Sequence, residues 1–137
     1  MKASAKKILP ALAVVIAVVV VVLITYSPKP TPENIAGLYS GNVVYEGDSY
    51  SGTIALLSNG TYAKIEYKNG EFFSSYSGDF LIDGSEVLLY TNSNHNEWLS
   101  YIYKNKSLQQ EGSERKYSRI LTEKELYASP EYANLFG

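Results

Sequence analysis

The chain has 137 residues, a formal net charge of −2, no cysteine and one histidine. This length leaves room for one domain beside a membrane segment and excludes a multidomain enzyme. The lack of cysteine excludes disulfides, thiolate metal sites, a cysteine nucleophile and a lipid-anchor cysteine. Because His95 is the only histidine, an imidazole metal cluster and a histidine-rich catalytic site are also excluded.

An apolar run of 17 residues extends from Ile8 to Ile24, and three lysines precede it. With the two residues after it, the run reaches about 26 to 28 Å as a helix, close to the roughly 30 Å of a bilayer core. We therefore predict a membrane anchor in residues 1–27, with residues 8–26 in contact with the membrane. Lysines ahead of the run favour a single-pass protein of the cell membrane, with a cytoplasmic N-terminus and an extracytoplasmic C-terminal domain.

Two other interpretations of this run stay open. A cleaved secretory signal usually has an apolar region of about 7 to 15 residues that ends at a small-residue cleavage site. Here the only suitably placed small residue, Ser27, is followed by Pro28, which disfavours cleavage. The second alternative is a filament subunit, in which the apolar helix packs in the core of a fibre. The anchor and the cleaved signal both export residues 28–137.

Prolines alternate with other residues at positions 28, 30 and 32. This pattern predicts an extended, polyproline-type spacer over residues 28–35.

From residue 36 onward, apolar and polar residues alternate and turn residues recur every eight to twelve positions, which is typical of an all-β domain. We predict a small antiparallel up-and-down meander closed into a barrel, since closure removes exposed sheet edges, with a two-sheet sandwich as the alternative. Asn69-Gly70 and Asp83-Gly84 predict two-residue type I′ turns. The eight expected strands are residues 37–45, 50–57, 61–68, 71–82, 85–91, 97–103, 107–111 and 115–121.

Alternation also predicts which side chains share a face. In residues 61–68, Ala63, Ile65 and Tyr67 point one way, and Lys64, Glu66 and Lys68 are expected on the water side. In residues 71–82, one face is expected to carry Phe72, Tyr76, Phe80 and Ile82. Gly78 predicts a bend that lets this strand serve two parts of a curved sheet.

We expect the domain to extend over residues 36–137 and to end in a helical cap. Thr122 and Glu125 have the spacing of a capping box, and Pro130 suits the first position of a second short helix. We expect these helices to pack on the barrel and plug one end through four residues: Leu126, Tyr127, Leu135 and Phe136.

Several segments of residues 36–112 are similar to a known family. They are Gly37-Leu-Tyr39-Ser-Gly41, Ile54 to Tyr62, Gly78-Asp-Phe80 with Asp83-Gly84 and Val87-Leu-Leu89, and Tyr103 to Leu108. These segments resemble small lipocalin-like envelope barrels, in particular the N-terminal domain of the NlpE copper-resistance lipoproteins. The resemblance implies the barrel fold and an extracytoplasmic location. The lipid-anchor cysteine and the CxxC pair of that family have no counterpart here, so copper binding and redox sensing are not expected.

Reactive groups do not converge in this sequence. His95 beside Glu97 supplies at most two of the three or four protein ligands of a zinc site, so no metal and no cofactor are expected. No nucleophile elbow or phosphate-binding loop is present, so catalysis is not expected. Asn59 and Asn105 lie in glycosylation sequons on predicted turns, which matter only in a host that glycosylates exported chains.

Basic residues do not favour nucleic acid as a partner. Outside residues 1–27, nine Lys and Arg stand against fourteen Asp and Glu. The densest basic group is expected to form a solvated charged face; its members are Lys104, Lys106, Arg115, Lys116 and Arg119.

Thirteen tyrosines are the most unusual feature of the composition. A ring with a polar tip suits the mouth of a ligand-holding barrel or a protein-recognition patch, although tyrosine also simply fills strand positions. We therefore expect a lipocalin-like binding or scaffolding module without catalysis, with a protein or a small apolar ligand as its partner. The alternatives are a carrier of an apolar ligand or lipid inside the barrel and a subunit of a surface filament or assembly. The candidate ligand-binding residues are Tyr76, Phe80, Trp98 and Tyr101.

Overall fold

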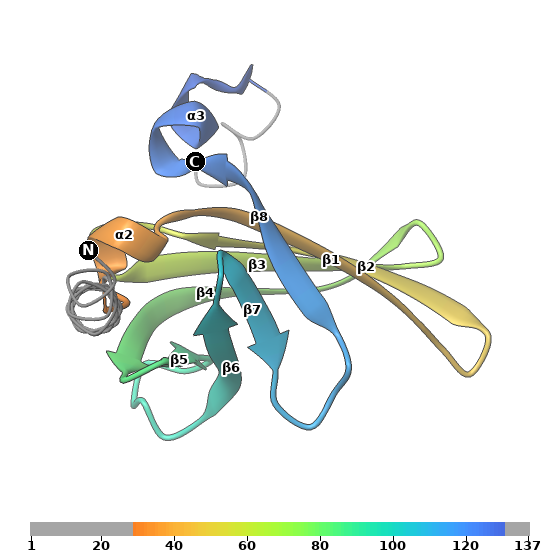
Figure 1. The fold of residues 1–137 in the computed structure, drawn as a ribbon. Coiled ribbons are helices and arrows are strands. Elements are labelled where there is room, and N and C mark those ends of the chain that lie inside the picture. Colours follow the sequence, from red (N-terminus) through yellow and green to blue (C-terminus); the bar gives the residue numbers. More distant parts are fainter. Residues whose placement is uncertain (1–28, 131–137) are drawn as a thin grey trace, which may run out of the picture.

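The computed structural model describes residues 29–130, which form a closed barrel of eight antiparallel strands (Figure 1). Each strand pairs with the next one along the chain, and β8 pairs with β1. The predicted up-and-down barrel is therefore confirmed over the sandwich. Every expected strand is present, with its ends moved by no more than two residues. The strands are β1 (Gly37–Tyr45), β2 (Asp48–Leu56), β3 (Thr61–Lys68), β4 (Glu71–Asp83), β5 (Glu86–Tyr90), β6 (Trp98–Lys104), β7 (Ser107–Gln110) and β8 (Lys116–Thr122).

Some predictions concern residues outside this range. The predicted membrane anchor, residues 1–27, lies outside the described residues, as do Leu135 and Phe136 of the predicted C-terminal cap. Between residues 29 and 130, the structure contains no helix with the length and apolar character that a membrane span requires.

The types of the hairpin turns are set by which residues adopt positive φ. Both residues of Asn69-Gly70 have positive φ, which confirms the type I′ turn there. The type I′ turn predicted at Asp83-Gly84 is wrong. Asp83 pairs with Glu86, so the two central residues are Gly84 and Ser85, and of these Gly84 has positive φ. This is the type II′ pattern, which places glycine at the first central position.

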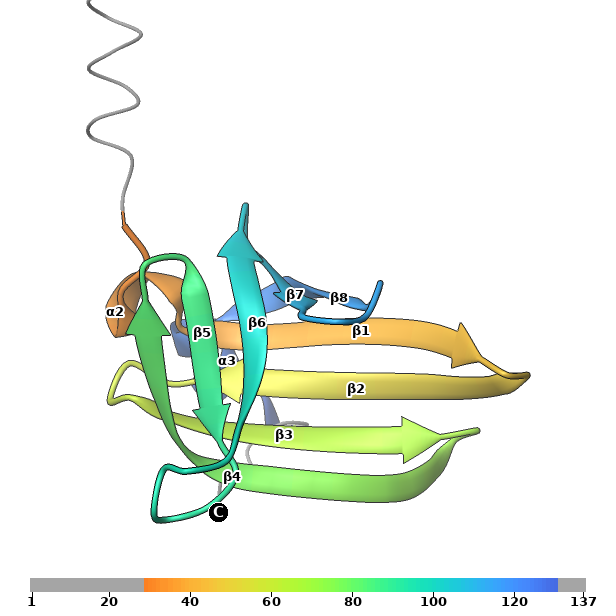
Figure 2. The ribbon, with the colours of Figure 1, turned by 90° about the horizontal axis from the view of Figure 1, so that it is seen from below.

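The long strand β4 belongs to two parts of the barrel, as predicted. It pairs with β3 through residues 71–79 and with β5 through residues 80–83. The change of partner occurs beside Gly78, where a Cβ atom would lie 3.1 Å from the carbonyl oxygen of Tyr90. Figure 2 shows the result: β5 and β6 run across the direction of β1–β3 at one end of the long sheet.

Closure of the barrel covers only one end of β1–β4. Strand β8 reaches β1 along residues 37–40, and β5 reaches β4 along residues 80–83. The four long strands continue beyond these pairings (Figure 2). We call their continuation the open platform and the remainder of the barrel the closed part. The open platform consists of residues 42–45, 48–51, 65–68 and 71–77.

The closed part is filled by buried side chains, and the helix α2 (Pro32–Ile35) covers one of its ends. Ile35 is buried with the core, and the Tyr39 hydroxyl donates a hydrogen bond to the Ile35 carbonyl oxygen at 2.5 Å. Thr31 begins this helix in a capping box with Asn34. The second half of the predicted extended spacer is therefore a helical turn that belongs to the barrel. The core consists of Ile35, Tyr39, Ile54, Leu56, Tyr62, Phe80, Val87, Leu89, Tyr101, Leu108 and Tyr117.

The second helix, α3 (Glu123–Ala128), begins at the predicted capping box. The Thr122 hydroxyl accepts a hydrogen bond from the Glu125 backbone N–H at 3.2 Å, and the Glu125 carboxylate accepts one from the Thr122 N–H at 3.2 Å. The Thr122 hydroxyl also donates to the Glu125 carboxylate at 2.9 Å, and this bond, together with the one from the Thr122 N–H, holds the pKa of the Glu125 carboxyl below its usual value. The predicted capping box is confirmed.

The position of α3 differs from the prediction. Leu126 packs against Leu38 and Ala55, which alternate with core residues and therefore face outward from β1 and β2. Tyr127 is exposed. The prediction that this helix plugs the barrel is wrong: α3 covers an apolar patch on the outside, and α2 closes the end.

Candidate functional site

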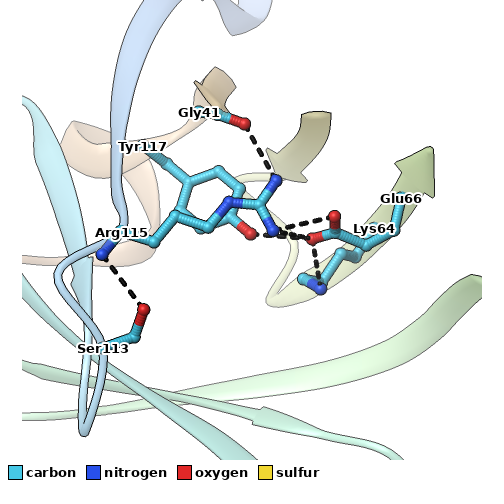
Figure 3. Close-up of polar contacts among 6 residues, drawn as sticks. All are labelled: Gly41, Lys64, Glu66, Ser113, Arg115 and Tyr117. Atoms are coloured by element: carbon cyan, nitrogen blue, oxygen red, sulfur yellow. Dashed lines mark hydrogen bonds and ion pairs between the residues drawn. The ribbon is translucent and has the colours of Figure 1, made fainter. Parts of the chain in front are cut away.

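A group of charged side chains is buried inside the barrel at the border between the closed part and the open platform (Figure 3). Lys64, Glu66 and Arg115 are 6%, 5% and 7% exposed, and the fully buried Tyr117 lies beside them. We call these four residues the ionic cluster. Lys, Glu and Arg are almost never this buried unless they are paired and hydrogen-bonded.

The sequence-based expectation placed Lys64 and Glu66 on the water side of β3, and this is wrong. Tyr62 is part of the core, so Lys64 and Glu66, two and four residues further on, point inward with it. Ala63 and Ile65 take the outer face, where they are half-buried.

Glu66 is the centre of the ionic cluster. Its Oε1 atom accepts hydrogen bonds from Lys64 Nζ at 2.8 Å, Arg115 Nη1 at 2.9 Å and the Tyr117 hydroxyl at 2.7 Å. Its Oε2 atom accepts a further bond from Arg115 Nη1 at 2.8 Å. Burial alone would raise the pKa of the Glu66 carboxyl, but the bonds from Lys64, Tyr117 and Arg115 hold it below its usual value. Glu66 is therefore a carboxylate at neutral pH.

Two glycines make room for the ionic cluster: Gly52 for Arg115 and Glu66, and Gly41 for the Tyr117 ring. Gly41 and Gly52 are paired across β1 and β2. A Cβ atom on Gly52 would lie 2.6 Å from both Arg115 Nη2 and Glu66 Oε1. Arg115 Nη2 instead donates to the Gly41 carbonyl oxygen at 2.9 Å, and its guanidinium lies 4.6 Å above the Tyr117 ring. The glycine pair is thus a requirement of the cluster.

The ionic cluster carries more positive than negative charge. Lys64 and Arg115 are two cations, and Glu66 is the one carboxylate bonded to them. Two buried polar atoms, the Tyr101 hydroxyl and Arg115 Nε, have no hydrogen-bond partner among residues 29–130. The Tyr101 ring meets the Tyr117 ring edge-on at 5.8 Å. Burial, reinforced by the Glu66 charge, raises the pKa of Tyr101 above its usual value, so its hydroxyl stays protonated.

The open platform presents aromatic rings on the face that continues the barrel interior. A β-bulge opposite Glu66 and Tyr67 adds one residue to β4 and brings Phe73 edge-on to Tyr50 at 5.9 Å. Lys68 Nζ lies 5.7 Å from the Tyr50 ring and 5.9 Å from the Phe73 ring. The bulge leaves Phe72 beside Tyr67 on the outer face. The prediction that Phe72 shares a face with Tyr76 is therefore wrong.

The inner face of the platform adjoins the ionic cluster. Phe73 and Tyr76 are 56% and 41% exposed there. Tyr76 pairs directly with Lys64, whose Nζ atom lies 5.9 Å from the Tyr76 ring centre. The structure thus joins an exposed aromatic surface to the buried ionic cluster, where Arg115 Nε and the nearby Tyr101 hydroxyl have no hydrogen-bond partner within residues 29–130.

The four predicted ligand-binding residues do not form one lining. Phe80 and Tyr101 lie together in the core of the closed part. Tyr76 lies on the open platform. Trp98 begins β6 on the outer face, exposed and edge-on to Tyr90 at 6.3 Å, because it alternates with the inward-facing Leu99 and Tyr101.

The remaining residues that the sequence singled out lie in exposed loops. His95 stacks on the Tyr90 ring at 4.2 Å, and its Nε2 atom lies 3.2 Å from Asp79 Oδ2. Within the described range, no three His, Cys, Asp or Glu side chains are grouped to hold a metal. Asn59 and Asn105 occupy exposed turns after β2 and β6.

Arg115 is the functional candidate that sequence reasoning missed, since it was expected in a solvated basic face. The position of Arg115 could have been predicted from Tyr117. Side chains two residues apart on extended backbone point the same way, so Arg115 points inward with Tyr117. Lys104 and Lys116 do lie on the outer surface, beside an open hollow of about 510 Å³.

No family model matches the chain, and neither the curated proteins nor the solved structures contain a match. The structure supports one part of the resemblance to the copper-resistance lipoproteins, namely a small eight-stranded antiparallel barrel.

Proposed function

We propose that residues 36–137 are a non-catalytic, lipocalin-like binding module, held on the outside of the cell membrane by the N-terminal anchor. The binding surface is the inner face of the open platform. The observation that carries this proposal is the incomplete cover of the long sheet: β5–β8 bury its inner face in the closed part and leave Phe73 and Tyr76 exposed beyond. Exposed aromatic surface next to a few convergent polar groups is typical of ligand sites.

The placement of the platform supports this role. Helix α2 and the turn between β1 and β2 lie at opposite ends of the long sheet (Figure 2). An anchor that precedes residue 29 would join the domain at the α2 end, so the platform would remain free on the other side. The rings are also held in place, because each platform strand is hydrogen-bonded to its neighbour. A ligand would meet a preformed surface, which lowers the entropic cost of binding.

The ligand that suits this face is a small molecule with an apolar body. We would test it by titrating the water-soluble, neutral probe 3-phenylpropanol into the ¹⁵N-labelled full-length chain in zwitterionic nanodiscs. Amide signals of residues 48–51 and 71–77 are expected to shift. Phe73→Ser is expected to weaken binding by about tenfold, since a buried aromatic contact is lost.

Phe72→Ser is the matched control, because Phe72 is the neighbouring residue on the outer face. This variant should bind within about twofold of the unmodified chain. Equal losses for the two variants, or no shift of the platform signals, would refute the platform as the binding surface. Protease treatment of intact cells tests the location independently: digestion of residues 36–137 is expected, and their protection would contradict the orientation.

A second candidate function is a subunit of a surface assembly. Within residues 29–130, the edges of β1 along 41–45 and of β4 along 71–79 have no neighbouring strand. Free edges of this kind pair readily with another chain. Size measurement of the full-length chain in mild detergent separates the candidates: a monomer at high concentration would exclude the assembly.

A further inference from the structure

The ionic cluster holds two cations and one carboxylate, and among residues 29–130 neither Lys64 nor Arg115 is paired with a second carboxylate. Arg115 cannot lose its proton in a protein, and Lys64 shares the Glu66 carboxylate with it. Two further carboxylates lie on the inner face of the platform. Asp48 is bonded to Asn69 and paired with Lys68 at 3.6 Å, and the exposed Glu71 lies opposite Lys68 at the start of β4. Buried charge without a counter-ion is costly, so an anion from outside the chain would stabilise the cluster.

The two unpartnered donors point to the same chemistry. Arg115 Nε carries a proton that it can only donate, and the neutral Tyr101 hydroxyl can donate as well. Both donors lie near the Glu66 carboxylate. Arg115 is hydrogen-bonded to this carboxylate, and the negative charge of Glu66 acts on the Tyr101 hydroxyl. A guanidinium and a hydroxyl are a strong donor set for an oxyanion, because hydrogen bonds to a charged acceptor are shorter and stronger than neutral ones.

The ionic cluster adjoins the inner face of the platform. Lys64 connects the two surfaces: its Nζ atom is 2.8 Å from Glu66 Oε1 and 5.9 Å from the centre of the exposed Tyr76 ring. Beyond Tyr76, the face continues with Phe73 and Tyr50. An apolar body on these rings would place a charged end group beside Lys64.

We propose that the ionic cluster binds the carboxylate of an organic monoanion whose apolar body lies on Tyr50, Phe73 and Tyr76. Arg115 Nε and the Tyr101 hydroxyl donate to the carboxylate, and Lys64 supplies the nearby positive charge. One negative charge balances the excess of the cluster, which favours a carboxylate over a doubly charged phosphate. This inference rests on the proposed function and specifies its ligand class.

Three matched probes test the inference on the full-length chain in zwitterionic nanodiscs: 3-phenylpropionate, 3-phenylpropanol and 3-phenylpropylammonium. The carboxylate is expected to bind at least about tenfold more tightly than the alcohol, because it adds charge-assisted hydrogen bonds. The ammonium should bind no better than the alcohol. The ¹H–¹⁵N signal of Arg115 Nε should shift with the carboxylate and stay in place with the alcohol. Empty nanodiscs correct for uptake by lipid.

Tyr101→Phe separates binding from structure, because it removes a hydroxyl that makes no hydrogen bond within the described residues. The variant should keep the fold and its affinity for the alcohol, and lose several-fold of its preference for the carboxylate. Tyr103→Phe is the control, since Tyr103 also packs against the core but lies beside Tyr39, at the end closed by α2. Its preference should be unchanged. A purely structural cluster would leave the preference of both variants unchanged.

The outcomes distinguish the two proposals. Equal affinity for the three probes would overturn the anion site and leave the platform as a binding surface. If acetate moves the Arg115 Nε signal in both the unmodified chain and Phe73→Ser while the alcohol does not bind, the anion site stands and the platform role fails. No movement of that signal with acetate or 3-phenylpropionate would overturn the anion site.

Discussion

The closed part and the open platform share the four strands β1–β4, yet they differ in what covers the inner face of these strands. In the closed part, Tyr39, Ile54 and Tyr62 are buried under β5–β8. On the platform, the alternation continues unbroken in β1–β3, but Phe73 and Tyr76 are largely exposed. The difference arises because the second half of the barrel is shorter than the first. An aromatic residue at an inward position is therefore a core residue or a surface residue according to the length of strands far away in the sequence.

The ionic cluster lies at the border between these regions, and this position has a physical meaning. Charges deep in the closed part would lack partners, and charges on the platform would be screened by water. At the border, Glu66 accepts bonds from three side chains while remaining next to the exposed face. Substitutions that disturb the ionic cluster should therefore lower the free energy of unfolding most. Substitutions that remove single hydroxyls should change it least.

Glu66→Leu should have the largest effect, a loss of about 3–5 kcal/mol in the free energy of unfolding, because Lys64 and Arg115 would be left as buried cations without a counter-charge. Urea unfolding of the full-length chain in mild detergent measures it. Glu71→Leu, at the exposed start of β4, is the control and should stay within about 0.5 kcal/mol. Equal stability of the two variants would show that the cluster does not support the closed part.

Gly52→Ala should have the next largest effect, a loss of about 1–3 kcal/mol, because the added methyl group overlaps Arg115 Nη2 and Glu66 Oε1, each 2.6 Å away. The same unfolding experiment measures it. Ser51→Ala, one residue earlier on the opposite face of β2, is the control. A Gly52→Ala chain of unchanged stability would contradict the close fit of the guanidinium over the glycine pair.

Acid should weaken the cluster less than removal of Glu66, since a protonated carboxyl keeps some of its hydrogen bonds. The folded pKa of Glu66 lies below the ordinary value of 4.5, so its contribution to stability is present above pH 4.5 and is lost as pH falls through the folded pKa. Unfolding midpoints measured across this window should fall more steeply with acid for the unmodified chain than for Glu66→Gln. Parallel curves would show that Glu66 makes no pH-dependent contribution.

Replacing two tyrosines of the closed part by phenylalanine should change the free energy of unfolding in opposite directions. These are the smallest expected effects. Tyr39→Phe removes the bond to the Ile35 carbonyl oxygen and should cost about 1 kcal/mol. Tyr101→Phe removes a hydroxyl with no partner in the described residues and should be neutral or stabilising by about 1 kcal/mol. Thermal melts of the two variants check the contrast. A destabilised Tyr101→Phe chain would show that this hydroxyl already has a structural partner.

Part of the site was within reach of sequence reasoning. Gly41 and Gly52 are equidistant from the turn Glu46-Gly47, so a two-residue hairpin must pair them. Glycines in adjacent strands leave space for a large neighbour, and Glu66 lies next in the same row. The faces of β3 were harder to predict, because Tyr62 on one side and Ala63 with Ile65 on the other both look like a core. Phe73 was unpredictable for a similar reason: the bulge depends on how β3 and β4 pair.

The amino-acid sequence by itself determined the eight strands, most of their turns and the start of α3, because positive φ at turns, alternation along strands and the Thr122 cap act over only a few residues. The tertiary structure decided which face of β3 is buried, where the closure ends and that Arg115 meets Glu66 49 residues away. These features depend on strand pairings and packing between distant segments. A local pattern specifies how a strand alternates, whereas the length and position of its distant neighbours specify which of its side chains leave water.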